Sequence, residues 1–181
     1  MKKIYEFIRK RKRKTGFESL FLKEYDRFAQ QAKAATWELE QSDYGELYQS
    51  SLKLGQLCHG NYNQHNVYFL GRRQIFTSNF EKCGYDIQIN DLYQFVRKIM
   101  EKQEWSPQTG DQMLDAYSRE RPLDDREIAY LKIRLSYPEK FWKVANQYYN
   151  CRKSCASWKS MEKLEKLVFQ EEKRRIFLGF F

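Results

Sequence analysis

The sequence predicts a mainly α-helical fold with one small β-hairpin. Apolar residues recur every three or four positions through most of the chain, which is the period of an amphipathic helix. Residues 66–78 break this period with two short β-prone runs. The chain has 181 residues, of which 41% are hydrophobic and 17% aromatic, so it is large and apolar enough to form a core. We expect residues 1–181 to form a single domain.

Two helices are predicted before the β-prone runs. The first covers residues 17–39, and its apolar stripe consists of Phe17, Leu20, Phe21, Tyr25, Phe28, Ala32, Trp37 and Leu39. The second covers residues 44–54, because Gly55 stands where a helix commonly ends.

The hairpin is expected to pair residues 66–70 with residues 73–78 around a turn at Gly71 and Arg72. No other β structure is predicted. The helical period then returns over residues 92–100, 113–117, 128–135 and 158–177, with Pro107, Pro122 and Pro138 near segment starts. The last aromatic residues are expected to pack back onto the domain, namely Phe177, Phe180 and Phe181.

Composition argues against a membrane protein. No stretch approaches the roughly 20 apolar residues of a membrane helix, and Met1-Lys2-Lys3 leads into polar sequence unlike a signal peptide. Synthesis in the cytoplasm, without a membrane partner, is therefore expected. The four cysteines contain no Cys-x-x-Cys spacing, so free thiols are predicted at Cys58, Cys83, Cys151 and Cys155.

The chain is basic, with a formal charge of +9 from 33 Lys and Arg against 24 Asp and Glu. Much of the excess lies in residues 9–14 and 173–175, which suits acidic partners such as nucleic acid. A nucleic-acid module also needs base-reading or stacking residues in a recognisable motif, and none is found. We therefore interpret these blocks as solvated helix faces and do not expect nucleic acid as the partner.

One motif contains the candidate catalytic and metal-binding positions. Residues 57–69 read Leu-Cys-His-Gly-Asn-Tyr-Asn-Gln-His-Asn-Val-Tyr-Phe, and residues 77–81 read Thr-Ser-Asn-Phe-Glu. This resembles the catalytic loop and metal-binding segment of kinase-like phosphotransferases, whose pattern is His-Gly-Asp, four residues, Asn, a hairpin, then Asp-Phe-Asp/Glu. Together with residues 81–95 and the helix from Phe17, the chain resembles the CotS-like spore coat family over about residues 11–105. That resemblance implies the helical C-terminal lobe of a protein-kinase-like, aminoglycoside phosphotransferase-like fold.

In active members of this fold, the loop aspartate orients or deprotonates the attacking hydroxyl. The loop asparagine and the aspartate after the hairpin hold Mg²⁺. The corresponding positions here are Asn61, Asn66 and Asn79, so only Asn66 keeps the family residue. An amide cannot act as a general base, a role worth about 10²- to 10⁴-fold. Asn79 is also a poorer Mg²⁺ ligand than a carboxylate. Glu81, two residues further along a strand-like segment, is expected on the same face as Asn79 and is the remaining candidate carboxylate for the metal.

The resemblance gives structural roles to two further residues. It implies that His59 packs under the loop and that Asp91 braces the loop from below, although Asp91 could equally cap its helix. His59 and His65 with Cys58 or Cys83 match no common zinc spacing. Core packing is the favoured interpretation for the nearby aromatic residues, which are Tyr62, Tyr68, Phe69, Phe76 and Phe80.

The N-terminal nucleotide-binding lobe of the family is expected to be absent. The chain has no Gly-x-Gly-x-x-Gly and opens in what resembles the first helix of the C-terminal lobe. Such a lobe alone would expose the apolar floor of the nucleotide cleft, so we expect an exposed apolar patch near residues 61–66 and 79–81. That patch is the expected docking surface.

The resemblance implies a catalytically degenerate kinase-like protein that acts as a structural or interaction component of the spore coat. Its expected partners are other coat proteins, its expected location is the mother-cell cytoplasm and then the coat, and no cofactor is expected. The alternative is a weak Mg-ATP-dependent small-molecule phosphotransferase completed by a separate N-terminal lobe, with Glu81 and Asn66 holding the metal. A third hypothesis, a nucleic-acid-binding module, rests on charge alone.

Overall fold

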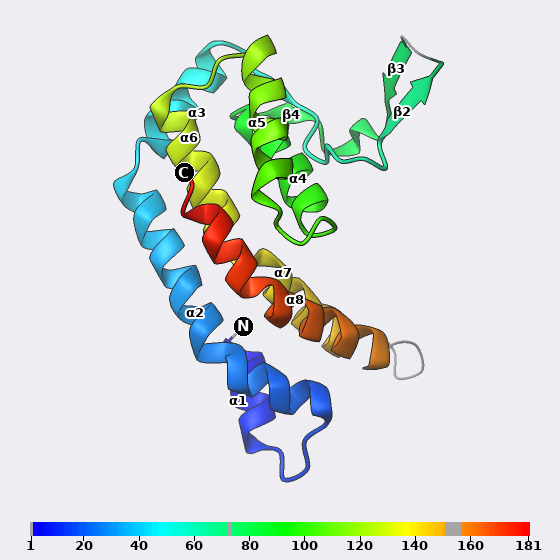
Figure 1. The fold of residues 1–181 in the computed structure, drawn as a ribbon. Coiled ribbons are helices and arrows are strands. Elements are labelled where there is room, and N and C mark those ends of the chain that lie inside the picture. The colour runs from blue at the N-terminus through cyan, green and yellow to red at the C-terminus, as the bar shows by residue number, and fades with distance from the viewer. Residues whose placement is uncertain (1, 72–73, 151–156) are drawn as a thin grey trace. The chain divides into compact units, whose positions relative to one another are not determined.

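The structure is a computed structural model, and it describes residues 2–71, 74–150 and 157–181 (Figure 1). Helices dominate, and the predicted mainly α-helical fold with a small hairpin is confirmed. In chain order the elements are α1 (Lys2–Lys10), α2 (Gly16–Gln41), α3 (Tyr44–Lys53), β1 (Leu57–Cys58), β2 (Val67–Leu70), β3 (Gln74–Thr77), the 3₁₀ turn η1 (Phe80–Lys82), β4 (Gly84–Tyr85), α4 (Ile89–Met100), α5 (Pro107–Glu120), α6 (Asp125–Ser136), α7 (Glu139–Asn150) and α8 (Ser157–Leu178).

Local signals set several helix ends. Before α2, the Thr15 hydroxyl accepts from the Glu18 amide at 3.2 Å, and the Glu18 carboxylate accepts from the Thr15 amide at 2.9 Å. This reciprocal capping box starts the helix at the residue after Thr15. Gly55 follows α3 with φ of +64°, as its predicted helix-ending role requires. The Ser106 side chain caps α5, and Pro107 occupies the first helical position.

The expectation of a single β element is wrong. Besides the predicted β2–β3 hairpin, β1 pairs antiparallel with β4, with Leu57 opposite Tyr85 and Cys58 opposite Gly84. Each of these strands has two residues, too few to show alternation, and the partners are distant in sequence. Helices α1 and α7 were likewise not predicted from the periodicity of the sequence.

The chain divides into two compact units, and each has its own core. One unit consists of Met1–Thr36 and Ser136–Glu172, and the other of Trp37–Leu135 and Lys173–Phe181. The core of the first is built on buried Ile8, Phe17, Phe21, Phe28, Phe141, Trp142, Val144, Ala145 and Leu164. The core of the second is built on buried Leu47, Ile87, Ile89, Leu92, Tyr93, Val96, Met100, Trp105, Tyr130, Leu131, Leu135 and Phe177. The candidate loop and the hairpin belong to the second unit.

The C-terminal aromatic residues follow the prediction only in part. Phe177 is buried in the core of the second unit and Phe181 packs against it, but Phe180 is 65% exposed. Cys58 is a buried and Cys83 an exposed free thiol, while Cys151 and Cys155 lie outside the described residues. No helix in the described parts of the chain combines the length and apolar character that a bilayer span requires.

The basic blocks are not simple solvated helix faces. Residues 11–14 lie in the connection between α1 and α2, where Arg11 pairs with the buried Glu18. In the second block, Arg174 is buried and donates to the Leu135 carbonyl at 2.8 Å. Several of these cations therefore serve internal contacts, which a count of charges along the sequence does not reveal.

Candidate functional site

The candidate loop joins β1 to β2 and depends on a glycine. Gly60 has φ of +74°, a conformation that side chains disfavour. A Cβ atom at this position would lie 2.0 Å from the Lys82 carbonyl oxygen. The β1–β4 ladder brings Gly84, two residues after Lys82, beside Cys58. The close approach of two backbone segments thus accounts for the glycine in the His-Gly motif.

Helix α4 supports this loop from its first turns. The Asp91 carboxylate accepts from the His59 amide at 2.5 Å and from the Gly60 amide at 2.9 Å. One turn further along, the Gln94 side-chain amide donates to the Gly60 carbonyl at 3.0 Å. The alternative that Asp91 caps its helix is wrong, because the cap position is Gln88 and Asp91 lies inside α4.

His59 connects the loop to the segment after the hairpin. Its Nδ1 accepts from the Asn61 amide at 3.2 Å, so Nε2 carries the proton and donates to the Ser78 carbonyl at 2.8 Å. The ring is 7% exposed and packs beside Phe80, with ring centroids 4.7 Å apart. Both ring nitrogens are therefore occupied by backbone groups, and His59 acts structurally in this arrangement.

Three asparagines hold the middle of the loop. The Asn61 carbonyl accepts from the side-chain amides of Asn63, at 2.7 Å, and of Asn66, at 2.8 Å. Asn63 and Asn66 are buried, and the Asn66 carbonyl also accepts from the Ser78 amide at 3.0 Å. Since its amide nitrogen is engaged, Asn66 keeps its side-chain oxygen, the atom that would contact a cation.

Asn79 and Glu81 do not lie on a strand, and the expectation that they share a strand face is wrong. Asn79 has φ of 67° and ψ of 56°, in the left-handed region, and Phe80–Lys82 form a 3₁₀ turn. Asparagine tolerates this conformation better than most residues. The left-handed residue ends the extended course of β3, so alternation of faces stops before Glu81. Both side chains are exposed.

The donor set does not fit a Mg²⁺ site of the family type. The positions that would hold the metal are Asn66, Asn79 and Glu81, which supply one carboxylate and two neutral amides, whereas Mg²⁺ in proteins is held by carboxylates and substrate phosphates. In the part of the chain that the structure describes, no three His, Cys, Asp or Glu side chains gather as a group that could hold a metal. Burial, with the nearby Asp91 and Asp86 charges, raises the pKa of the Cys58 thiol to about 12, so it is not available as a thiolate.

Most aromatic residues near the loop are exposed, so the core interpretation is wrong for them. On β2 and β3, Tyr68 lies opposite Phe76, and Phe69 lies opposite Ile75. Because adjacent residues of a strand point to opposite faces, these pairs give the hairpin apolar side chains on both faces. Phe69 is 73% and Ile75 63% exposed. Tyr62 is half-buried against His59 and Phe95.

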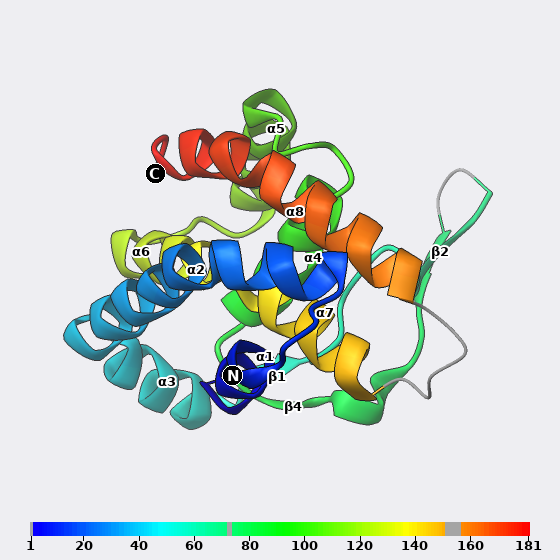
Figure 2. The same ribbon diagram turned by 90° about the horizontal axis from the view of Figure 1, so that it is seen from below.

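The expected exposed apolar patch is present but extends beyond its predicted place. Phe80, beside the loop, is 54% exposed. The surface continues along the hairpin, which extends away from α4 and α5 in both views of the molecule (Figures 1 and 2). Side-chain type alone cannot predict this exposure, because it depends on which elements cover the hairpin.

Comparison with known proteins identifies the family. The family described as "Spore coat putative kinase YutH" matches residues 1–181. The chain belongs to this family. Spore coat protein S of Bacillus subtilis (strain 168) is 25% identical to this YutH-family chain over 164 residues, which are 90% of the chain and 46% of that protein. The predicted likeness to CotS-like spore coat proteins is thereby confirmed.

The fold of the YutH-family chain is that of a kinase-like C-terminal lobe. The crystal structure of an aminoglycoside phosphotransferase from Alicyclobacillus acidocaldarius superposes with a TM-score of 0.88 at 19% identity, covering 98% of this chain and 53% of that one. The chain spans about half the length of both relatives. At this identity the superposition establishes the fold, and the predicted fold class is confirmed.

Four contributors to the site were not singled out from the sequence, namely Gly60, Asn63, Ser78 and Gln94. Ser78 acts through its backbone carbonyl and amide, which side-chain identity does not predict. Gln94 had a usable signal, because it lies three positions after Asp91 and hence on the same helix face.

Proposed function

We propose that this YutH-family chain is a catalytically degenerate kinase-like protein that acts as an interaction component of the spore coat. The observation that carries the proposal is Asn61 at the position of the family's catalytic aspartate. Its amide cannot take a proton from an attacking hydroxyl. The asparagines around it form a hydrogen-bonded network through the Asn61 carbonyl, so the loop is kept as structure although the base is missing.

The metal positions support the same proposal. Asn79 replaces the family's second aspartate, and Glu81 is an exposed side chain on a 3₁₀ turn. Phosphoryl transfer depends almost entirely on positioned metal and electrostatic stabilisation, so a site with two missing carboxylates is poorly suited to it. No cofactor is therefore part of the proposal.

Asn61→Asp tests the catalytic side. We expect neither the natural chain nor this variant to transfer phosphate from Mg-ATP, because restoring the base leaves Asn79 in place. Calorimetric titration of ATP with and without Mg²⁺, at about 1 mM nucleotide, should show no binding that requires Mg²⁺. Turnover recovered by Asn61→Asp would overturn the proposal. Mg-dependent binding lost in both Asn66→Ala and Glu81→Ala would instead support the weak Mg-ATP phosphotransferase.

The apolar hairpin supports an interaction role. A two-stranded hairpin is marginally stable by itself, and this one exposes Phe69 and Ile75 on one face with Tyr68 and Phe76 on the other. Burying such residues is worth about 1.5 to 3 kcal/mol each. Another coat protein with an apolar surface is the partner that this chemistry favours.

Localisation during sporulation tests the interaction side. A fluorescent fusion of the chain, produced in sporulating Bacillus subtilis, should concentrate at the spore coat. The variant Phe69→Ser with Ile75→Ser should lose this localisation, because it removes the apolar hairpin surface. Asn61→Ala should localise like the natural chain, because no catalysis is required.

A matched control separates docking from general loss of surface apolarity. Phe169 and Ile176 on α8 are 70% and 53% exposed, so Phe169→Ser with Ile176→Ser makes the same changes elsewhere. The control fusion should remain at the coat. Coat localisation of the hairpin variant, or its loss in Asn61→Ala, contradicts the proposed role.

A further inference from the structure

Helices α1 and α2 enclose a hollow of about 730 Å³ on the surface of the first unit. Beside the hollow, the rings of Tyr5 on α1 and Tyr25 on α2 stack with their centroids 4.0 Å apart. Ile8 of α1 is fully buried. The volume falls within the roughly 300 to 1,000 Å³ range of small-molecule sites. Its lining residues are Lys2, Tyr5, Glu6, Arg9, Lys10, Tyr25, Asp26, Ala29, Gln30 and Lys33.

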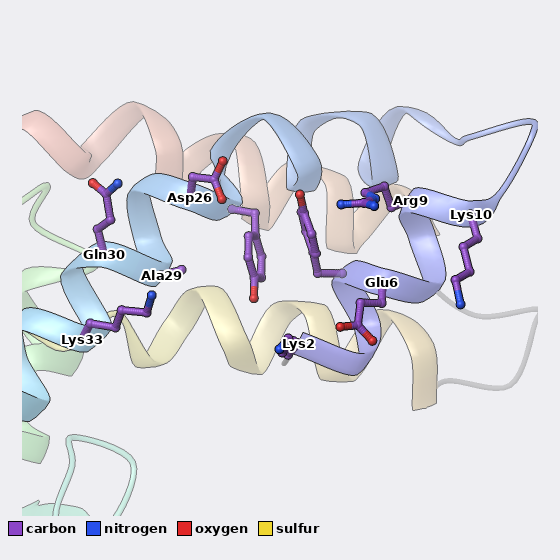
Figure 3. A pocket seen from close by; sticks show the side chains of 10 residues that line it. Lys2, Glu6, Arg9, Lys10, Asp26, Ala29, Gln30 and Lys33 are labelled. Carbon is purple, nitrogen blue, oxygen red and sulfur yellow. The ribbon is translucent and has the colours of Figure 1, made fainter.

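Cations line opposite ends of this hollow. Figure 3 shows Lys33 on α2 at one end, and Arg9 and Lys10 on the last turn of α1 at the other. With Lys2 there are four cationic side chains against the two carboxylates of Glu6 and Asp26, so the lining is positive.

These four cations differ from their neighbours in the same unit. Arg11 pairs with Glu18, and Arg27 pairs with Glu24. Among residues 2–71, 74–150 and 157–181, in contrast, no ion pair engages Lys2, Arg9, Lys10 or Lys33. The charges of these four side chains are thus available to pair with a ligand.

The lining of the hollow also contains neutral hydrogen-bond donors. Burial, together with the nearby Tyr5, Asp26 and Glu6, raises the pKa of the Tyr25 hydroxyl. The hydroxyl therefore keeps its proton at neutral pH and can donate to an oxyanion. Gln30, an exposed residue of the lining, carries a side-chain amide that can also donate. Cations and neutral donors within one lining suit the oxygens of phosphate groups.

From this geometry we propose that the hollow binds a small molecule that carries two or more phosphate groups. Cations at both ends require negative charges spaced along the ligand, which a single phosphate does not supply. A membrane surface fits less well, because Ile8 of α1 is buried in the core and Ile4 packs against that core, so that little of the apolar face of α1 beyond Phe7 is exposed. This site is separate from the candidate loop and does not depend on the proposed function.

The test uses inorganic tripolyphosphate, titrated calorimetrically into the full chain with a chelator present and about 50 mM salt. The site variant is Arg9→Glu with Lys33→Glu, which removes a cation from each end. The control is Lys12→Glu with Arg13→Glu, in the connection after α1 and outside the lining. Each double variant exchanges two cations for two anions, so both lower the net charge equally.

The natural chain should bind one tripolyphosphate. The site variant should bind about 100-fold more weakly, since each lost charge-assisted contact is worth roughly a factor of ten. The control should lose no more than about threefold, through screened long-range charge alone. Equal weakening in the two variants would show that only net charge attracts the probe, and would overturn the proposal. Absence of saturable binding by the natural chain would overturn it as well.

Discussion

Gly60→Ala should destabilise the loop-bearing unit by about 2 to 5 kcal/mol, summing roughly 1 to 2 for an alanine at positive φ and roughly 1 to 3 for overpacking. The added methyl carbon would lie 2.0 Å from the Lys82 carbonyl oxygen and 2.8 Å from its carbonyl carbon, which are backbone atoms and not the end of a flexible side chain. Relief requires the loop and the η1 segment to move apart. Urea unfolding followed by circular dichroism measures the loss, and amide hydrogen exchange over residues 58–66 locates it.

Gly55→Ala is the matched control. Gly55 also has a positive φ, of +64°, but nothing lies within 4 Å of its would-be Cβ. It should cost only about 1 to 2 kcal/mol, the backbone contribution alone. Equal losses in the two variants would show that the close approach to Lys82 contributes nothing to the requirement for glycine.

Asp91→Ala should destabilise the same unit by about 2 to 6 kcal/mol, because two amides lose their acceptor and each costs roughly 1 to 3. The carboxylate accepts from the His59 and Gly60 amides, so its removal strips both bonds at once. Asp91→Asn should lose about half as much, because its remaining carbonyl oxygen can still accept. Urea unfolding should therefore rank the natural chain as the most stable, Asp91→Asn as intermediate and Asp91→Ala as the least stable.

Asp111→Ala controls for the loss of an acidic residue from a helix. Asp111 is an exposed residue of α5, so its replacement should change stability by no more than about 0.5 kcal/mol. If Asp91→Ala behaves like Asp111→Ala, the loop does not depend on α4 for its position. Faster hydrogen exchange at His59 and Gly60 in Asp91→Ala would identify the bonds that were lost.

Features encoded by neighbouring residues were predictable. Helix α2 follows from its repeating apolar stripe, the end of α3 from Gly55, and the β2–β3 hairpin from two β-prone runs. The spacing from His59 to Asn66 likewise predicted the loop and the fold. These signals are readable because the interacting residues lie within a few positions of one another.

The replaced carboxylates are also visible in the sequence, since residue identity alone shows that Asn61 and Asn79 cannot ionise. The backbone conformation around Asn79, in contrast, could not be predicted from the sequence. Extended backbone was expected through Glu81, but the left-handed Asn79 starts a 3₁₀ turn. The conformation of a single residue depends on what its neighbours in space permit, and here Ser78 beside it is held by His59 and Asn66.

The sequence by itself determined most of the helices, though not α1 and α7, together with the hairpin, the family and the loss of two catalytic carboxylates, because each depends on local period or on residue identity. Tertiary structure alone decided the β1–β4 ladder, the choice of loop support over capping for Asp91, the exposure of the hairpin aromatics and the cationic hollow between α1 and α2. Each of these is a contact or a solvent boundary between segments distant in sequence. Such contacts leave no periodic signal, since they arise only when the chain has packed.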